Sequence, residues 1–198
     1  MKLASCVLCV AALLQAGCSS MRLVDSDVTS FTPAAAKPIT VPASYRFERL
    51  PSQQARAEHQ AQLEALAVPV LALFGLRRND QAAQYSVQID VRVQQDLHDT
   101  WESPWFGVSR HHFIGFGPGR HGRFGLVAIH SDFAAYRREV SVVLRSTPDN
   151  QVVYESRAQH EGRWSDDAAV VPAMLQAALN GFPQAPTGLR KVNIEIPR

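Results

Sequence analysis

The sequence predicts an α+β domain in which two helices pack on one face of a largely antiparallel sheet, giving a two-layer sandwich. Several segments alternate apolar and polar residues with period two, as strands with one face in water do. Two other segments place apolar residues three and four apart, as helices with one apolar face do. Such elements bury their apolar faces most economically against each other, which gives the two layers.

The first seventeen residues differ from the rest of the chain in composition. Met1 and Lys2 give a short positive start, and residues 3–14 form an apolar run without charge. This is the layout of a secretory signal. The run is shorter than the roughly 20 apolar residues that a permanent membrane helix needs. We therefore interpret residues 1–17 as a signal peptide that is removed.

A cysteine follows the apolar run directly. Residues 14–18, Leu-Gln-Ala-Gly-Cys, resemble the lipobox at which bacterial lipoprotein precursors are acylated and cleaved. Cleavage between Gly17 and Cys18 would leave Cys18 as the lipidated first residue, although the pattern prefers leucine where Gln15 stands. The alternative is an ordinary signal peptide and a free thiol at Cys18. Ser19 follows the cysteine instead of aspartate, which by resemblance to the enterobacterial sorting rule implies the outer membrane.

The mature chain is close to neutral and holds a single cysteine. Cys6 and Cys9 leave with the signal, so no intramolecular disulfide can form and the core must stabilise the fold. The mature chain keeps 181 of the 198 residues, which is enough for one domain. Its balanced charge argues against nucleic acid as a partner and leaves the acyl chains to attach the protein to the membrane.

Residues 18–44 form the N-terminal segment of the mature chain. They are rich in Ser, Thr, Ala and Pro, and three prolines disfavour helix there. We expect a lipidated N-terminus followed by an extended tether. Residues 23–31 are a possible exception, because their weak alternation could dock a first strand on the domain. The single α+β domain itself is expected over residues 45–198.

A short strand and a long helical stretch open the domain. Tyr45 and Phe47 alternate with arginine and glutamate, as in a strand. From Ser52, which we expect to cap the helix, apolar residues follow at three-four spacing up to Phe74. Pro69 lies inside this pattern. We expect it to kink or divide the helix, because proline removes one hydrogen bond and crowds the preceding turn.

The middle of the chain contains the clearest alternation. Residues 85–93 alternate strictly, which predicts a strand with one wet face. Residues 140–144 and 152–158 repeat the pattern on either side of Thr-Pro-Asp-Asn, whose turn chemistry predicts a hairpin.

A second helix and a last strand complete the predicted elements. Asp166 and Asp167 open a helical pattern whose apolar residues run at three-four spacing to Phe182. Glycine and proline at its end stop the helix. Residues 192–196 alternate again and predict a strand before the chain ends.

Five short pieces of the chain occur in an order typical of one protein family. They are residues 27–31 (Asp-Val-Thr-Ser-Phe), 45–53 (Tyr-Arg-Phe-Glu-Arg-Leu-Pro-Ser-Gln), 75–76 (Gly-Leu), 153–155 (Val-Tyr-Glu) and 182–183 (Phe-Pro). Together with the lipobox they resemble the bacterial lipoprotein family called domain of unknown function 4136. The resemblance implies an envelope lipoprotein and a fold. It implies no reaction and supplies no catalytic residues.

Residues 97–125, between two predicted strands, are unusually rich in aromatic residues, glycine and histidine. Exposed aromatic side chains beside glycine and arginine suit a contact with a protein or a membrane. The alternative is that they fold back on the sheet, since large aromatic residues are usually mostly buried. The candidate interaction residues are Trp101, Trp105, Phe106, Phe113 and Phe116.

The same segment contains histidines that could bind zinc or copper. The candidates are His98, His111, His112 and His121. Their spacing matches no known metal motif, and no second thiol is available, so the alternative is a surface loop with solvated histidines. Residues 117–122 spell the dinucleotide fingerprint, but residues 124–129 after it have the pattern of a strand. A phosphate site of that kind needs a helix there, so we interpret the match as chance.

No motif for catalysis is present in the sequence. It has no nucleophile elbow, no His-Glu-x-x-His and no P-loop. We therefore expect a noncatalytic lipoprotein of the outer membrane that faces the periplasm and has no cofactor. It would bind or scaffold another envelope component through residues 97–125. The alternative is a carrier of a small ligand or metal that uses the same loop, and a hydrolase with a spatially assembled triad is a third hypothesis.

Overall fold

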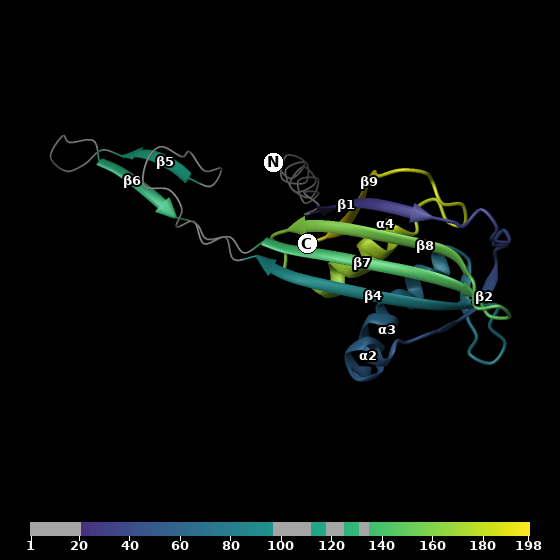
Figure 1. The fold of residues 1–198 in the computed structure, drawn as a ribbon. Coiled ribbons are helices and arrows are strands. Elements are labelled where there is room, and N and C mark those ends of the chain that lie inside the picture. Colours follow the sequence, from purple (N-terminus) through teal and green to yellow (C-terminus); the bar gives the residue numbers. More distant parts are fainter. Residues whose placement is uncertain (1–20, 97–111, 118–124, 131–134) are drawn as a thin grey trace, which may run out of the picture.

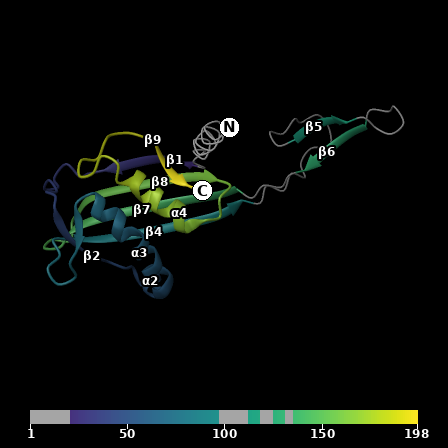
Figure 2. The same ribbon diagram turned by 180° about the vertical axis from the view of Figure 1, so that it is seen from behind.

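The computed structural model describes residues 21–96, 112–117, 125–130 and 135–198. Seven strands form one mixed sheet in the order β3-β2-β4-β7-β8-β1-β9, and helices form a second layer on it (Figure 1, Figure 2). Neighbouring strands are antiparallel except where β2 pairs with β3 and with β4. The predicted α+β fold class is confirmed.

The elements have the following bounds. The strands of the large sheet are β1 (Met21–Phe31), β2 (Ala43–Phe47), β3 (Leu76–Arg78), β4 (Tyr85–Asp96), β7 (Ala135–Ser146), β8 (Val152–Gly162) and β9 (Arg190–Pro197). The helices are α2 (Pro51–Gln54), α3 (Ala57–Leu73) and α4 (Asp167–Ala178). β5 (His112–Gly117) and β6 (Gly125–His130) pair with each other in a second sheet.

β1 lies inside the large sheet, between β8 and β9. The possible strand at residues 23–31 is therefore present, and it begins two residues earlier, at Met21. Its alternation is weak because two of its four buried side chains, Arg22 and Ser26, are polar. The sheet thus includes residues that fall within the expected tether.

The long helical stretch is divided, but at a different place from the one expected. Residues 55–56 separate α2 from α3, whereas α3 continues through Pro69. Ser52 does not cap the helix, because Leu50 is the N-cap and Pro51 follows it. Proline suits this first helical position, where a backbone N–H would have no partner within the helix. β3 was not predicted, because three residues are too short to show a period.

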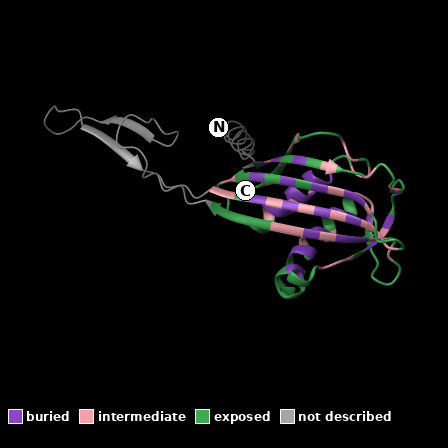
Figure 3. Ribbon diagram, viewed as in Figure 1, coloured by how far each residue is buried: buried purple, intermediate pink, exposed green. Residues whose placement is uncertain are grey.

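The two long helices cover the same face of the sheet (Figure 2). Along the strands, buried positions alternate with more exposed ones (Figure 3). The other face carries ion pairs such as Arg157–Glu139 at 3.5 Å and Lys191–Asp25 at 3.7 Å, so it is the wet face. The largest apolar side chains of the core are Tyr45, Leu71, Leu76, Ile89, Leu144, Tyr154, Met174, Leu175 and Leu179.

Two arginines hold the beginning of α4 against the sheet. Asp166 caps the helix, as its side chain accepts a hydrogen bond from the backbone N–H of Ala169 at 3.2 Å. Arg22 of β1 donates to Asp166 at 2.6 Å, and this hydrogen bond lowers the pKa of that carboxyl. Arg138 of β7 donates from Nε to Asp167 at 2.7 Å and from Nη2 to the Trp164 carbonyl at 2.6 Å.

We predict that Asp167→Asn lowers the free energy of unfolding by about 3 kcal/mol, because it leaves the charge of the fully buried Arg138 without its carboxylate. Glu161→Gln is the control. It breaks the Arg137–Glu161 pair, in which both side chains are more than half exposed, and is expected to cost about 0.5 kcal/mol. Urea unfolding measures both. Equal losses would contradict a special role for Arg138.

Candidate functional site

Most of the predicted site residues lie outside the described residues. These are the lipobox residues Gly17 and Cys18 and, in the segment 97–125, the aromatic residues Trp101, Trp105 and Phe106 and the histidines His98, His111 and His121. His112, Phe113 and Phe116 lie on β5, which pairs with β6 along the whole length of both strands. The interaction and metal hypotheses for these residues therefore stay predictions.

The dinucleotide fingerprint can be placed in part. Gly117 is the last residue of β5, and the next described element is β6, which begins at Gly125. A strand after the glycines was predicted and is present. No described helix follows the fingerprint directly, so the match lacks the helix N-terminus that a pyrophosphate would need.

Among the residues that the structure describes, none form a group of three or more His, Cys, Asp and Glu that could hold a metal ion. Two histidines have described side chains. His59 is exposed, and the buried His160 places Nδ1 2.6 Å from the backbone oxygen of Asp25. Neither forms a hydrogen bond with a serine or cysteine in these parts of the chain, so no histidine is paired with a nucleophile there.

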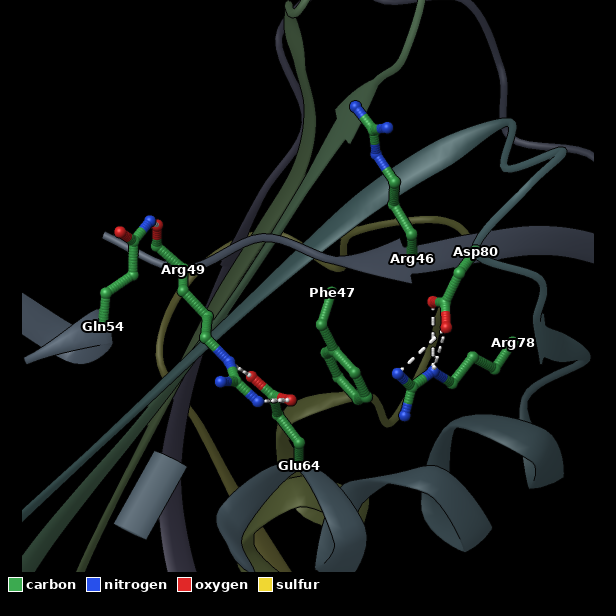
Figure 4. Close-up of a pocket in the computed structure, with 7 residues that line it drawn as sticks. All are labelled: Arg46, Phe47, Arg49, Gln54, Glu64, Arg78 and Asp80. Carbon is green, nitrogen blue, oxygen red and sulfur yellow. Dashed lines mark hydrogen bonds and ion pairs between the residues drawn. The ribbon is translucent and has the colours of Figure 1, made fainter. Parts of the chain in front are cut away.

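A cavity of about 380 Å³ opens where β2, α3 and the chain after β3 meet (Figure 4). We call the seven residues that line it the arginine pocket. They are Arg46, Phe47, Arg49, Gln54, Glu64, Arg78 and Asp80. Three arginines and two carboxylates line the pocket, so its lining carries an excess of positive charge.

The strand β2 and its parallel neighbour β3 position three of these side chains, Arg46, Phe47 and Arg78. On β2, Tyr45 is buried, Arg46 is exposed and Phe47 is half-buried, as expected from the alternation. Tyr45 is the register partner of Arg78 on β3. In Figure 4, Arg46 points to the opposite side of β2 from Phe47.

Arg49 and Glu64 form the shortest ion pair of the pocket. Nε and Nη2 of Arg49 donate to the two carboxylate oxygens of Glu64, both at 2.6 Å. The Glu64 side chain is only 5% exposed and that of Arg49 is 30% exposed. Such a fork geometry, in which a planar guanidinium meets a carboxylate through two bonds, fixes both groups. Nη1 of Arg49 is not used in this pair.

Arg78 and Phe47 form the other wall. The Arg78 guanidinium lies 5.3 Å from the centre of the Phe47 ring. Its Nε donates a hydrogen bond to the Asp80 carboxylate at 3.1 Å. Phe47 in turn meets the Tyr45 ring edge to face, with ring centres 5.2 Å apart. The wall therefore offers a cation and an aromatic ring side by side.

Tyr45 lies behind this wall, with its hydroxyl buried. The hydroxyl has no hydrogen-bond partner among the described residues. Burial is the main reason why the pKa of Tyr45 rises to about 12, and the nearby Arg78 opposes this rise. The phenol is therefore neutral at ordinary pH.

Arg46 differs from the other two arginines, because no carboxylate pairs with it in the described part of the chain. It also lines a second cavity of about 540 Å³, which shares Phe47, Arg49 and Gln54 with the arginine pocket. There Glu48 accepts a hydrogen bond from Ser86 at 2.5 Å. The guanidinium of Arg46, unpaired among the described residues, thus lies where the two cavities adjoin.

Sequence reasoning missed this site. Arg46, Phe47 and Arg49 belong to the run 45–53, which carried the family resemblance, but we interpreted that run only as a strand and a helix start. The density of arginine in it was an available signal. Glu64, Arg78 and Asp80 come from later elements, and nothing in their spacing indicates that they join it.

A family model described as "Domain of unknown function (DUF4136)" matches residues 29–184. No curated protein matches the chain. Among solved structures, a PDZ domain protein from Parabacteroides distasonis is similar with 9% identity and a TM-score of 0.47, covering 94% of this chain and 41% of that one. The PelC dodecamer from Paraburkholderia phytofirmans is similar with 14% identity and a TM-score of 0.43, covering 82% and 99%. Similarity this distant transfers no function.

We predict that Tyr45→Phe keeps or raises the free energy of unfolding, by up to about 1 kcal/mol, because it removes a buried hydroxyl without a partner. Tyr154→Phe is the matched variant. It removes a buried hydroxyl that donates to the Ala178 carbonyl at 3.2 Å, and is expected to cost about 1 kcal/mol. Thermal unfolding at neutral pH compares the two, and a larger loss for Tyr45→Phe would contradict the assignment.

The raised pKa of Tyr45 also predicts a pH dependence. The folded state holds the phenol proton up to about pH 12, whereas the unfolded chain loses it near the ordinary pKa of 10.0. The contribution of this bound proton to the free energy of unfolding is therefore complete below pH 10.0 and is lost as the pH rises toward 12. Between these two pH values, the unfolding temperature should therefore fall less steeply with pH in Tyr45→Phe than in the unchanged protein. Equal slopes would be the contrary result.

Proposed function

This chain belongs to the DUF4136 family, as its sequence pieces predicted, and from this premise we propose that it is a noncatalytic envelope lipoprotein. We propose further that it binds an anionic group of another envelope component at the arginine pocket. The observation that carries this proposal is that three arginines line one cavity, of which Arg46 has no carboxylate partner among the described residues.

The anchor is the lipid on Cys18, the residue that ends the lipobox. Ser19 behind it favours the outer membrane, and the exported domain then faces the periplasm. Among the described residues, no helix has the length and apolar character to cross a bilayer. Two or more acyl chains on one cysteine suffice for stable attachment.

Arginine suits recognition of a carboxylate or a phosphate, because its planar fork can donate two parallel hydrogen bonds. In the arginine pocket, Arg49 donates hydrogen bonds to Glu64, and Arg78 donates to Asp80. Arg46 is exposed and is paired with no carboxylate of the described residues, so an incoming anion need not displace one of these from it. The excess positive charge would attract the anion before contact.

The pocket also suits the body of a ligand. The ring of Phe47 is half-buried and lies beside Arg78, so it offers an apolar face next to a donor. A volume of about 380 Å³ fits a small group rather than a folded domain. We therefore propose a ligand in which a carboxylate or phosphate is attached to a flat or apolar unit.

The chemistry of the pocket supports a binding role without catalysis. Arginine stays protonated at any physiological pH and cannot take or give a proton there. Glu64 is buried and engaged in two hydrogen bonds with Arg49, so it is not available as a base. The aromatic residues Trp101, Trp105, Phe106, Phe113 and Phe116 remain predicted contacts for a protein partner.

Binding can be tested with inorganic phosphate and glucuronate as two anionic probes, in calorimetric titrations of the protein at low salt. We expect Arg46→Gln to weaken binding of at least one probe roughly tenfold, since a hydrogen bond to a charged group contributes about 1.5–3 kcal/mol. Arg92→Gln is the control, because Arg92 is 74% exposed and lies on β4 outside the pocket. Binding that is absent, or equal in both variants, would refute the site.

The anchor can be tested by metabolic labelling with palmitate and by fractionation of cells. Cys18→Ser should abolish the label and release the domain from the membrane fraction. Cys6→Ser and Cys9→Ser, which change only the predicted signal peptide, should leave both unchanged. Retained label in Cys18→Ser would show that the lipobox interpretation is wrong.

A further inference from the structure

Only two residues separate Cys18 from the first strand of the sheet. β1 begins at Met21, and the three intervening chain steps span at most about 11 Å. The headgroup layer of a bilayer is itself several ångströms deep. An acylated Cys18 would therefore hold the beginning of β1 at the membrane surface, with no tether between them.

Other chain segments meet at the same end of the sheet. Met21 pairs with Pro197 at the end of β9, Tyr136 near the start of β7 pairs with Gly162, and the end of β4 pairs with the start of β7. In Figure 1 the beginning of β1 and the C-terminus lie at this end. The arginine pocket lies at the opposite end, where Tyr45 of β2 pairs with Tyr85 at the start of β4.

This end of the sheet exposes side chains that suit a headgroup layer. Met21, Leu23 and Trp164 are 43, 50 and 38% exposed. The Trp164 ring lies near two guanidinium groups, 5.1 Å from that of Arg22 and 5.7 Å from that of Arg198. Tryptophan prefers the boundary between the apolar core and the headgroups, where its apolar ring and its polar N–H are both satisfied.

We propose that the end of the sheet formed by Met21, Leu23 and Trp164 lies in the headgroup layer of the membrane that holds Cys18, with the strands running away from the bilayer. This inference rests on the proposed lipidation of Cys18. It adds the orientation of the domain. A strand of twelve residues such as β4 is about 35–40 Å long, so the arginine pocket faces the periplasm at about that height.

Fluorescence of the full-length lipidated protein in phosphatidylcholine vesicles tests this orientation. The chain has three tryptophans, so replacing Trp101 and Trp105 by phenylalanine leaves Trp164 as the only one. Vesicles with bromine at shallow acyl-chain positions should quench most of its emission and shift the emission to shorter wavelength. The control variant also carries Trp164→Phe and has Phe31→Trp, which places the probe at the far end of β1, and its emission should stay unchanged.

The vesicles are floated in a density gradient before each reading, so that attachment and orientation are measured separately. Protein that floats while Trp164 is not quenched would overturn the orientation and leave the anchor intact. Equal quenching at residues 164 and 31 would mean that the sheet lies flat on the membrane, which also overturns it. Protein that does not float would refute the lipid anchor itself, and with it both proposals.

Discussion

Arg138 carries a full positive charge into the core, and the position of α4 depends on how that charge is compensated. Its side chain is 0% exposed, and burying an isolated guanidinium would cost several kcal/mol. Asp167 and the Trp164 carbonyl offset this cost, and both lie where the chain enters α4. Because α4 packs on β1, β7, β8, β9 and α3, this interaction and the Arg22–Asp166 pair fix the start of the helix that joins the two layers.

The arginines at the two ends of the sheet serve different purposes, and their partners show why. Arg22 and Arg138 are buried, and each forms an ion pair with a carboxylate at the start of α4. Their charges are thus compensated by contacts that stabilise the fold. In the arginine pocket the guanidinium groups are more exposed, and the two carboxylates pair with Arg49 and Arg78 but not with Arg46. An exposed cation without a paired carboxylate contributes little to the stability of the fold, and binding is the role that we propose for it.

The elements that the sequence predicted are those whose periods are local. The alternation of β4, β7, β8 and β9 and the aspartate start of α4 needed no knowledge of distant residues. The features that were missed depend on contacts across the fold. Pattern analysis treats buried positions as apolar, so it could not assign the inward arginines Arg22 and Arg138. The pair Arg49–Glu64 joins residues fifteen positions apart, and no period relates them.

The short connection to the proposed anchor at Cys18 would change what the domain can do. A protein on a long tether samples many heights above the bilayer, whereas in our proposal the strand begins three positions after the lipidated residue and has almost no freedom. The rigid sheet then determines how far the arginine pocket lies from the membrane. In this arrangement the pocket meets ligands at one height, about 35–40 Å from the anchored end for strands of this length. The proposed geometry suits the capture of a component that is itself fixed relative to the membrane.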